Sequence, residues 1–250
     1  MGAKIEGMPI IVLRTGDAMP EVAASRGQFL KWIADHIGAA WDGEFKEHDA
    51  RTDAPLPDVM HGSAIIVTGS SASVTERAPW MLRAEDYLRA AVQRERPLLG
   101  ICFGHQLLAQ ALGGNVERNP RGREIGTVRV KLLPEASRDA LFLGLPSELE
   151  VNATHVDTVT RLPEGATLLA STSLERHAAY RVGESAWGVQ FHPEIDGDVM
   201  RGYVRAREPV IREEGLPFDR IHDAITDGQH GPLLLRNFVT RIAKRKQTGT

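Results

Sequence analysis

Residues 97–114 read PLLGICFGHQLLAQALGG, an apolar strand pattern followed at once by a helical one. The junction between the two is Gly100-Ile101-Cys102-Phe103-Gly104. A strand that turns sharply into a helix around a reactive side chain is a nucleophile elbow, and here cysteine stands where many hydrolases have serine. The two glycines relieve the crowding of such a turn and let strand and helix approach each other. The segment therefore predicts Cys102 at the end of a buried strand and the start of a helix.

Cys102 in this position is predicted to be a nucleophile. The dipole at a helix N-terminus lowers the pKa of a thiol and favours the thiolate. The backbone amide of Phe103 would then face an oxyanion that forms on a carbonyl group attacked by Cys102. The alternative is a small buried hydrophobic residue, which is the commoner role of a free cysteine. Because the chain has one cysteine, a disulfide framework and a cysteine-rich zinc site are excluded.

A partner base is found in GVQFHPE, residues 188–194. Side chains two positions apart in an extended segment point to the same face, so His192 and Glu194 can lie next to each other. A carboxylate beside an imidazole fixes the tautomer and stabilises the imidazolium after proton transfer. We predict His192 as the general base and Glu194 as the residue that orients it. A His-x-Glu pattern taken alone more often marks a surface ion pair.

The other histidines give weaker signals. His105 follows the elbow on the predicted helix and is expected to be a packing residue. His155 ends another predicted strand and can line the site. The remaining histidines show no partner pattern: His36, His48, His61, His177, His222 and His230. No spacing of histidines, cysteines and carboxylates matches a metal site, so we predict neither a metal nor a cofactor.

Around the elbow, short apolar runs alternate with amphipathic helical stretches, a pattern typical of βαβ units and a mostly parallel sheet with helices on both faces. The active site of such a sheet lies beyond the carboxyl ends of its strands. The strands of this part are predicted at 10–13, 44–48, 64–68 and 98–101, and the helices at 25–37, 80–93 and 104–112. The following strands are closely spaced, and we expect several to be antiparallel: 128–132, 150–155, 167–171, 178–182 and 187–191.

We expect one domain over residues 1–250, with a core at about 10–195 and a helical region at about 196–245 packed on it, interrupted near 215–217. The net charge of −3 leaves no electrostatic footprint for nucleic acid or an anionic membrane. No apolar run reaches the ~18 residues that a membrane span needs, and the start shows no secretory signal. A cytoplasmic location is therefore expected, and the basic end RIAKRKQTGT is predicted to be a solvated helix end.

PLLGICFGHQLLAQALGG and GVQFHPE together resemble the class I, or triad, glutamine amidotransferases, and are most similar to the glutaminase portion of GMP synthases. The resemblance runs from about residue 10 to residue 240. It includes VTGSS at 67–71, where the family has a glycine-rich oxyanion turn, REIG at 123–126 and LRNF at 235–238. It implies an α/β fold of the flavodoxin-like type, with an open, mostly parallel sheet and a smaller antiparallel region.

The resemblance also implies a role for each matching residue. Cys102 is the implied nucleophile, His192 the general base and acid, and Glu194 its orienting residue, with oxyanion-hole amides from Gly69 and Phe103. The implied substrate-binding residues are Ser70, Gln106, Thr154, His155, Val156 and Asp157. Ser70 departs from the family pattern, because many members have glycine there, so the backbone of this turn is expected to differ.

The implied activity is hydrolysis of the side-chain amide of glutamine through a cysteine thioester, which releases ammonia for a separate synthase subunit. A second interpretation is a γ-glutamyl amide or peptide hydrolase that acts alone. A third is a catalytically idle binding or regulatory protein that keeps the fold. We find no Gly-x-x-x-x-Gly-Lys phosphate loop and too little chain for an ATP-pyrophosphatase domain, so any synthase partner is expected on another chain.

Overall fold

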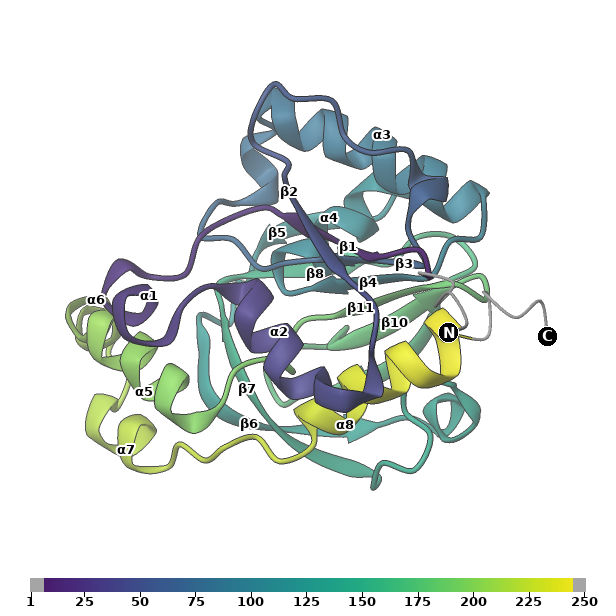
Figure 1. Ribbon diagram of the computed structural model, residues 1–250. Helices are drawn as coiled ribbons and strands as arrows, with labels where there is room; N and C mark the ends of the chain where they lie inside the picture. Colours follow the sequence, from purple (N-terminus) through teal and green to yellow (C-terminus); the bar gives the residue numbers. More distant parts are fainter. Residues whose placement is uncertain (1–6, 245–250) are drawn as a thin grey trace.

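The computed structural model describes residues 7–244, and these contain a nine-stranded sheet with the order β2-β1-β3-β4-β11-β10-β9-β6-β7 (Figure 1). The five strands at one side are parallel: β1 (Ile10–Arg14), β2 (Phe45–Asp49), β3 (Ala64–Val67), β4 (Leu98–Ile101) and β11 (Ala186–Val189). Their order is that of a flavodoxin-like sheet. The remaining strands alternate in direction: β6 (Glu124–Leu132), β7 (Glu148–His155), β9 (Thr167–Ser171) and β10 (Ala179–Val182). The predicted fold class is confirmed.

Helices cover both faces of the parallel strands. Alternate residues of β1 enter two different cores, because successive side chains of a strand point to opposite faces. Ile10 and Val12 pack in the core that includes α2 (Phe29–Ile37) and α8 (Gly231–Asn237). Ile11 and Leu13 pack in the core that includes α3 (Pro79–Gln93) and α4 (Phe103–Ala111). Figure 1 shows these two helix pairs on opposite sides of the sheet.

A third core lies beyond the carboxyl end of β1, where α1 (Pro20–Arg26) meets the helices that follow β11 (Figure 1). Those helices are α5 (Gly197–Ala206), α6 (Glu208–Glu213) and α7 (Phe218–Asp223). The break near 215–217 falls between α6 and α7, as predicted. After α8 the chain continues as a π-helix over Phe238–Ala243. The helical region after β11 therefore reaches the edge of the sheet where the site was predicted.

The structure differs from the expected elements in two places. The helix expected at 25–37 is two helices, α1 and α2, divided at Gly27, whose φ of 81° suits glycine. Two strands were not predicted: β5 (Asn115–Arg118) and β8 (Asp157–Arg161), which form a separate antiparallel pair. In β5 only Val116 is buried, so the sequence has no apolar alternation to reveal the strand.

Two expectations fall partly on the chain ends. Residues 1–6, where no secretory signal was recognised, and the basic residues 245–250 lie outside the described residues. Within residues 7–244, no helix has the length and apolar character that crossing a membrane demands.

Candidate active site

Cys102 occupies the turn between β4 and α4, with φ 51° and ψ −100°. A positive φ is strained for a residue with a Cβ, and such strain is concentrated at functional sites. A Cβ on Gly100 would lie 2.4 Å from the Gly104 carbonyl oxygen, and a Cβ on Gly104 would lie 2.6 Å from the Val67 carbonyl oxygen. The close approach of strand and helix therefore requires glycine at both flanking positions.

The end of β11 brings His192 to the elbow. The Cys102 amide donates a hydrogen bond to the Val189 carbonyl at 2.8 Å, and the His192 amide donates to the Asn152 carbonyl of β7 at 2.8 Å. The His192 Nδ1 lies 2.7 Å from Glu194 Oε1, and both side chains are almost completely buried. Because Nδ1 is engaged by the carboxylate, Nε2 is the nitrogen left for the sulfur.

The charges of this group reinforce each other. Burial alone raises the pKa of the Cys102 thiol, but the charge of His192 and a hydrogen bond from it leave that pKa below its ordinary value. Burial lowers the pKa of His192, but the charges of Glu194 and Cys102 raise it above the ordinary value. The arrangement can therefore hold a thiolate and an imidazolium together, which is the reactive form of a cysteine nucleophile.

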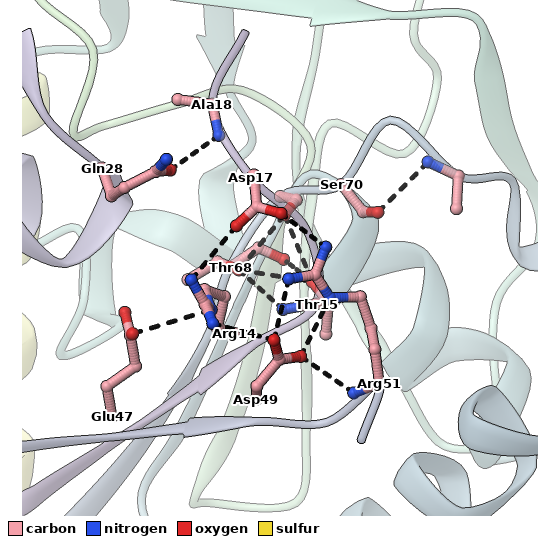
Figure 2. Close-up of polar contacts among 12 residues, drawn as sticks. Arg14, Thr15, Asp17, Ala18, Gln28, Glu47, Asp49, Arg51, Thr68 and Ser70 are labelled. Carbon is pink, nitrogen blue, oxygen red and sulfur yellow. Dashed lines mark hydrogen bonds and ion pairs between the residues drawn. The ribbon is translucent and has the colours of Figure 1, made fainter. Parts of the chain in front are cut away.

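Gly69 lies two residues after the end of β3 and packs against the same group. A Cβ on Gly69 would lie 2.9 Å from His192 Cε1 and 3.8 Å from the Cys102 Cβ. The Thr15 hydroxyl donates to the Thr68 carbonyl at 2.8 Å, and the Thr15 amide donates to the Thr68 hydroxyl at 3.1 Å (Figure 2). The loop after β1 thus holds the turn after β3 in place.

The departure at Ser70 has a local explanation. Ser70 has no positive φ, so a side chain fits there without backbone strain. Its hydroxyl accepts a hydrogen bond from the Ala72 amide at 3.1 Å (Figure 2). The turn is therefore stabilised by its own serine. Further out, Arg14 and Arg51 both pair with Asp49, each at 2.8 Å, which ties the ends of β1 and β2 together (Figure 2).

A pocket of about 240 Å³ opens in front of Cys102. All of the substrate-binding residues predicted from the sequence line it, together with the proposed nucleophile and Phe103: Ser70, Cys102, Phe103, Gln106, Thr154, His155, Val156 and Asp157. Gly69, His192 and Glu194 are not among its lining residues, although Gly69 lies against both His192 and Cys102. The structure thus brings every predicted site residue to the carboxyl edge of the parallel strands.

Hydrogen bonds hold the pocket wall. The Gln106 side-chain amide donates to the Asp157 carbonyl and to Gln190 Oε1, both at 3.0 Å. The Cys102 sulfur lies 3.9 Å from the Thr154 carbonyl oxygen. Gln190 was not singled out in the sequence, although it lies two residues before His192. His105 is fully buried behind the site against Tyr180, and burial lowers its pKa to about 3, so it stays neutral.

A second buried pair, His155 with Glu124, lies in the antiparallel part of the sheet. The two residues are register partners on β7 and β6, and Nε2 of His155 lies 3.0 Å from Glu124 Oε2. Nδ1 of His155 lies 3.0 Å from the Asp157 carbonyl oxygen. Burial lowers the pKa of His155, but the hydrogen bond and charge of Glu124 raise it above the ordinary value. Glu124 was noticed only as part of the REIG segment, because its partner is 31 residues away.

Three arginines line the pocket and were given no role in it from the sequence, although Arg123 belongs to the REIG segment: Arg118, Arg123 and Arg207. Arg118 belongs to β5, which itself was missed, and Arg207 directly follows α5 in the helical region. Only the packing of that region brings Arg207 to the site. Within the described part of the chain, no group of three or more histidine, cysteine or acidic side chains is arranged to hold a metal ion.

A strained elbow beside a buried His–Glu pair, at the carboxyl edge of a flavodoxin-like sheet, has the geometry of hydrolase sites that combine a nucleophile, a histidine and a carboxylate. The family model described as glutamine amidotransferase class-I matches residues 27–206. The chain therefore belongs to the class-I glutamine amidotransferase family, whose members are enzymes.

Individual relatives agree with this assignment. The chain is 32% identical over 180 residues to γ-glutamyl peptidase 4 of Arabidopsis thaliana, and the matched region covers 69% of this chain and 68% of the relative. It is 41% identical over 142 residues to the glutamine-hydrolysing GMP synthase of Porphyromonas gingivalis, covering 56% of this chain but only 26% of that enzyme. A solved glutamine amidotransferase from Thermotoga maritima has the same fold, with a TM-score of 0.73 at 22% identity over 94% of this chain and 98% of that one.

Proposed function

We propose that this chain hydrolyses γ-glutamyl carboxamides, first of all the side chain of glutamine, through a thioester on Cys102. The observation that supports this most directly is the strained Cys102 next to the buried His192–Glu194 pair, with Gly69 lying against both His192 and Cys102. Membership of the class-I glutamine amidotransferase family supports the choice of a γ-glutamyl amide as substrate.

In the proposed reaction the Cys102 thiolate attacks the amide carbon, and the new C–S bond moves an electron pair onto the carbonyl oxygen. The backbone amides of Gly69 and Phe103 would bind this oxyanion, and each such donor is worth about 10²- to 10³-fold in rate. His192 gives its proton to the nitrogen, the C–N bond breaks, and ammonia or an amine leaves. His192 then takes a proton from water, which attacks the thioester and releases glutamate and the thiolate.

Two fates of the released nitrogen are compatible with this chemistry. In the first, ammonia passes to a synthase partner on another chain, which is supported by the 41% identity to a glutamine-hydrolysing GMP synthase. In the second, the chain cleaves γ-glutamyl amides or peptides for its own sake, which is supported by the similarity to a γ-glutamyl peptidase over two thirds of that protein. In both, the described chain supplies the same nucleophile and base.

The proposed chemistry is tested by trapping Cys102. A glutamine analogue with a diazoketone in place of the amide should add one label to the wild-type chain, and a Cys102→Ala variant should take up none. Because Cys102 is the only thiol in the chain, the mass of the intact protein reads the result without mapping. Hydrolysis of glutamine that persisted in Cys102→Ala would show that the assignment of the nucleophile is wrong.

A further inference from the structure

The proposed reaction uses none of the three arginines that line the pocket, and Arg207 differs from the other two in its surroundings. Its guanidinium carbon lies 4.9 Å from the centre of the Tyr203 ring, and its Nη1 donates to the Met19 sulfur at 3.0 Å. A thioether is a weak acceptor, so the N–H groups of the guanidinium remain almost unsatisfied by it. Within residues 7–244 no carboxylate lies at ion-pair distance from Arg207.

The neighbouring arginines are in a different situation. Arg123 forms a two-pronged ion pair with Glu214, with distances of 2.8 and 2.9 Å, and Arg118 approaches the same carboxylate at 3.9 Å. The Glu214 carboxylate thus interacts with two guanidinium groups, and it forms no ion pair with Arg207. Burial lowers the pKa of Arg207 from its ordinary value. A half-buried charge without a counter-ion is costly, and a bound anion would offset that cost.

The position of Arg207 shows which part of a substrate it faces. A row of rings leads to it from the proposed general acid: His192 lies 6.4 Å from Phe29, Phe29 5.2 Å from Trp32, and Trp32 6.4 Å from Tyr203, all between ring centres. Arg207 packs on the far side of that row, against Tyr203. Phe29 and Tyr203 share a hydrophobic core with Ile195, which directly follows the His192–Glu194 pair, so Arg207 borders the pocket from the part of the molecule that also holds this pair.

Gln106 and Asp157 hold a different wall of the pocket, formed by α4 and the start of β8. His192 gives its proton to the departing nitrogen, so the leaving group must lie within reach of His192. A carboxylate attached to the leaving amine would be on the Arg207 side. Ammonia, the leaving group of glutamine, has no carboxylate that Arg207 could bind.

We propose that Arg207 binds a carboxylate of the leaving group, so that this site takes γ-glutamyl amino acids or short γ-glutamyl peptides in preference to glutamine. The inference rests on the cleavage of γ-glutamyl amides proposed above and selects between its two fates. The reaction is unchanged: the C–N bond breaks, His192 protonates the nitrogen, and a free amino acid leaves in place of ammonia.

The test compares two substrates of nearly equal shape. γ-Glutamylglycine and γ-glutamylethylamide differ in the end of the leaving group, which is a carboxylate in the first and a methyl group in the second. In the wild type, kcat/KM should be higher for γ-glutamylglycine. Arg207→Met keeps the apolar stem on Tyr203 and should lower kcat/KM for γ-glutamylglycine by about 10- to 100-fold while changing that for γ-glutamylethylamide less than about 2-fold.

Arg205 provides the matched control, because it lies two residues before Arg207, at the end of α5, and is exposed to solvent. Arg205→Met removes the same charge and should leave both substrates unaffected. An equal loss for both substrates in Arg207→Met would overturn the proposal, because Arg207 would then act on the glutamyl part or on folding. A wild type that shows no preference between the substrates would overturn it as well.

A binding measurement separates this inference from the proposed chemistry. In the Cys102→Ala background nothing is turned over, and calorimetry gives the Kd of each substrate. γ-Glutamylglycine should bind about 10-fold or more tightly than γ-glutamylethylamide, and adding Arg207→Met should abolish the difference. A difference that persists without Arg207 would overturn the inference even if Cys102 is the nucleophile. Conversely, a wild type that cleaves neither substrate would contradict the chemistry and leave this binding result to decide the role of Arg207.

Discussion

Two buried histidine–glutamate pairs act on the charge of Cys102, and they are built from different parts of the sheet. His192 and Glu194 are two residues apart, after the last parallel strand, with a separation of 2.7 Å between Nδ1 and Oε1. His155 and Glu124 are cross-strand partners in the antiparallel part, with 3.0 Å between Nε2 and Oε2. Both histidines have a raised pKa, and in both the nearby carboxylate contributes to the rise.

The difference lies in the second ring nitrogen. In His192 it is free to face the sulfur, whereas in His155 it is engaged by the Asp157 carbonyl. A carbonyl and a carboxylate are both acceptors, so His155 meets both only as an imidazolium with two N–H donors. His155 is thus a fixed positive charge, and His192 is a group that can exchange a proton. A histidine–carboxylate pair does not make a general base unless the other nitrogen is left unoccupied.

The largest expected effect comes from removing each histidine in turn. His192→Gln should lower kcat/KM by about 10⁴-fold, because both proton transfers are lost. His155→Gln should lower it by about 10-fold, because only a favourable charge near the thiolate is lost. Steady-state kinetics on γ-glutamylglycine and glutamine measure both. If the two losses were of similar size, His155 would take part in proton transfer and would not be a fixed positive charge.

Much of this site was predictable because its main residues are close in sequence. Cys102 is recognisable from glycines two positions away, and His192 with Glu194 from the alternation of an extended strand. Each of these patterns lies within a few residues, and local spacing determines local geometry. The parallel half of the fold was predictable for the same reason, since its strands are short, apolar and separated by helices.

The remaining features depend on contacts between distant segments. Glu124 meets His155 through strand pairing, and Arg207 reaches the pocket because α5 packs against α1. The short strand Asn115–Arg118 has one buried residue, so its sequence has no strand pattern. The strand is stabilised by its pairing with Asp157–Arg161. No spacing rule within one segment contains this information, because register and helix packing are tertiary properties.

The carboxylates of Glu194 and Glu124 provide the next test, because each should affect a different limb of the profile of activity against pH. The proposed reaction needs the Cys102 thiolate, so activity should fall as the pH drops through the lowered pKa of Cys102. The same reaction needs protonated His192, so activity should fall as the pH rises through the raised pKa of His192. Glu194→Gln removes a cause of the rise and should move the alkaline limb to lower pH. Glu124→Gln should instead weaken the His155 charge and move the acidic limb up by about one pH unit or less.

Alkylation of Cys102 reads the acidic limb without turnover. Iodoacetamide reacts with the thiolate, and Cys102 is the only thiol of the chain. In Glu124→Gln the midpoint of the alkylation rate should shift to higher pH. The exposed carboxylate Asp198 supplies the control, since Asp198→Asn should not move either limb. An unchanged midpoint in Glu124→Gln would mean that this pair does not act on the thiolate.

The smallest expected effect is on the free energy of unfolding. Its pH dependence distinguishes the His192 pair from the His155 pair, because the two differ in how many protons they take up on folding. Folding lowers the pKa of Cys102 and raises that of His192, so the proton that the thiol releases offsets the proton that the imidazole takes up. The pKa of His155 is raised as well, so His155 takes up a proton on folding without a thiol that releases one. His155 faces Cys102 and the buried Glu175 as well, and burial raises the pKa of Glu175.

A raised pKa in the folded state makes the stabilisation by His155 complete below its unfolded pKa, and the stabilisation is lost as the pH rises through the folded pKa. The free energy of unfolding should therefore fall above about pH 6.5, by at most about 1.4 kcal/mol per pH unit for one proton. Urea unfolding of the wild type at about pH 6.5, 7.5 and 8.5 measures this slope. His155→Gln should flatten it, and Glu124→Gln should do so with the histidine still present. A wild-type slope in His155→Gln would show that proton uptake by His155 is not the source of the slope and that the folded protein does not hold His155 as a cation.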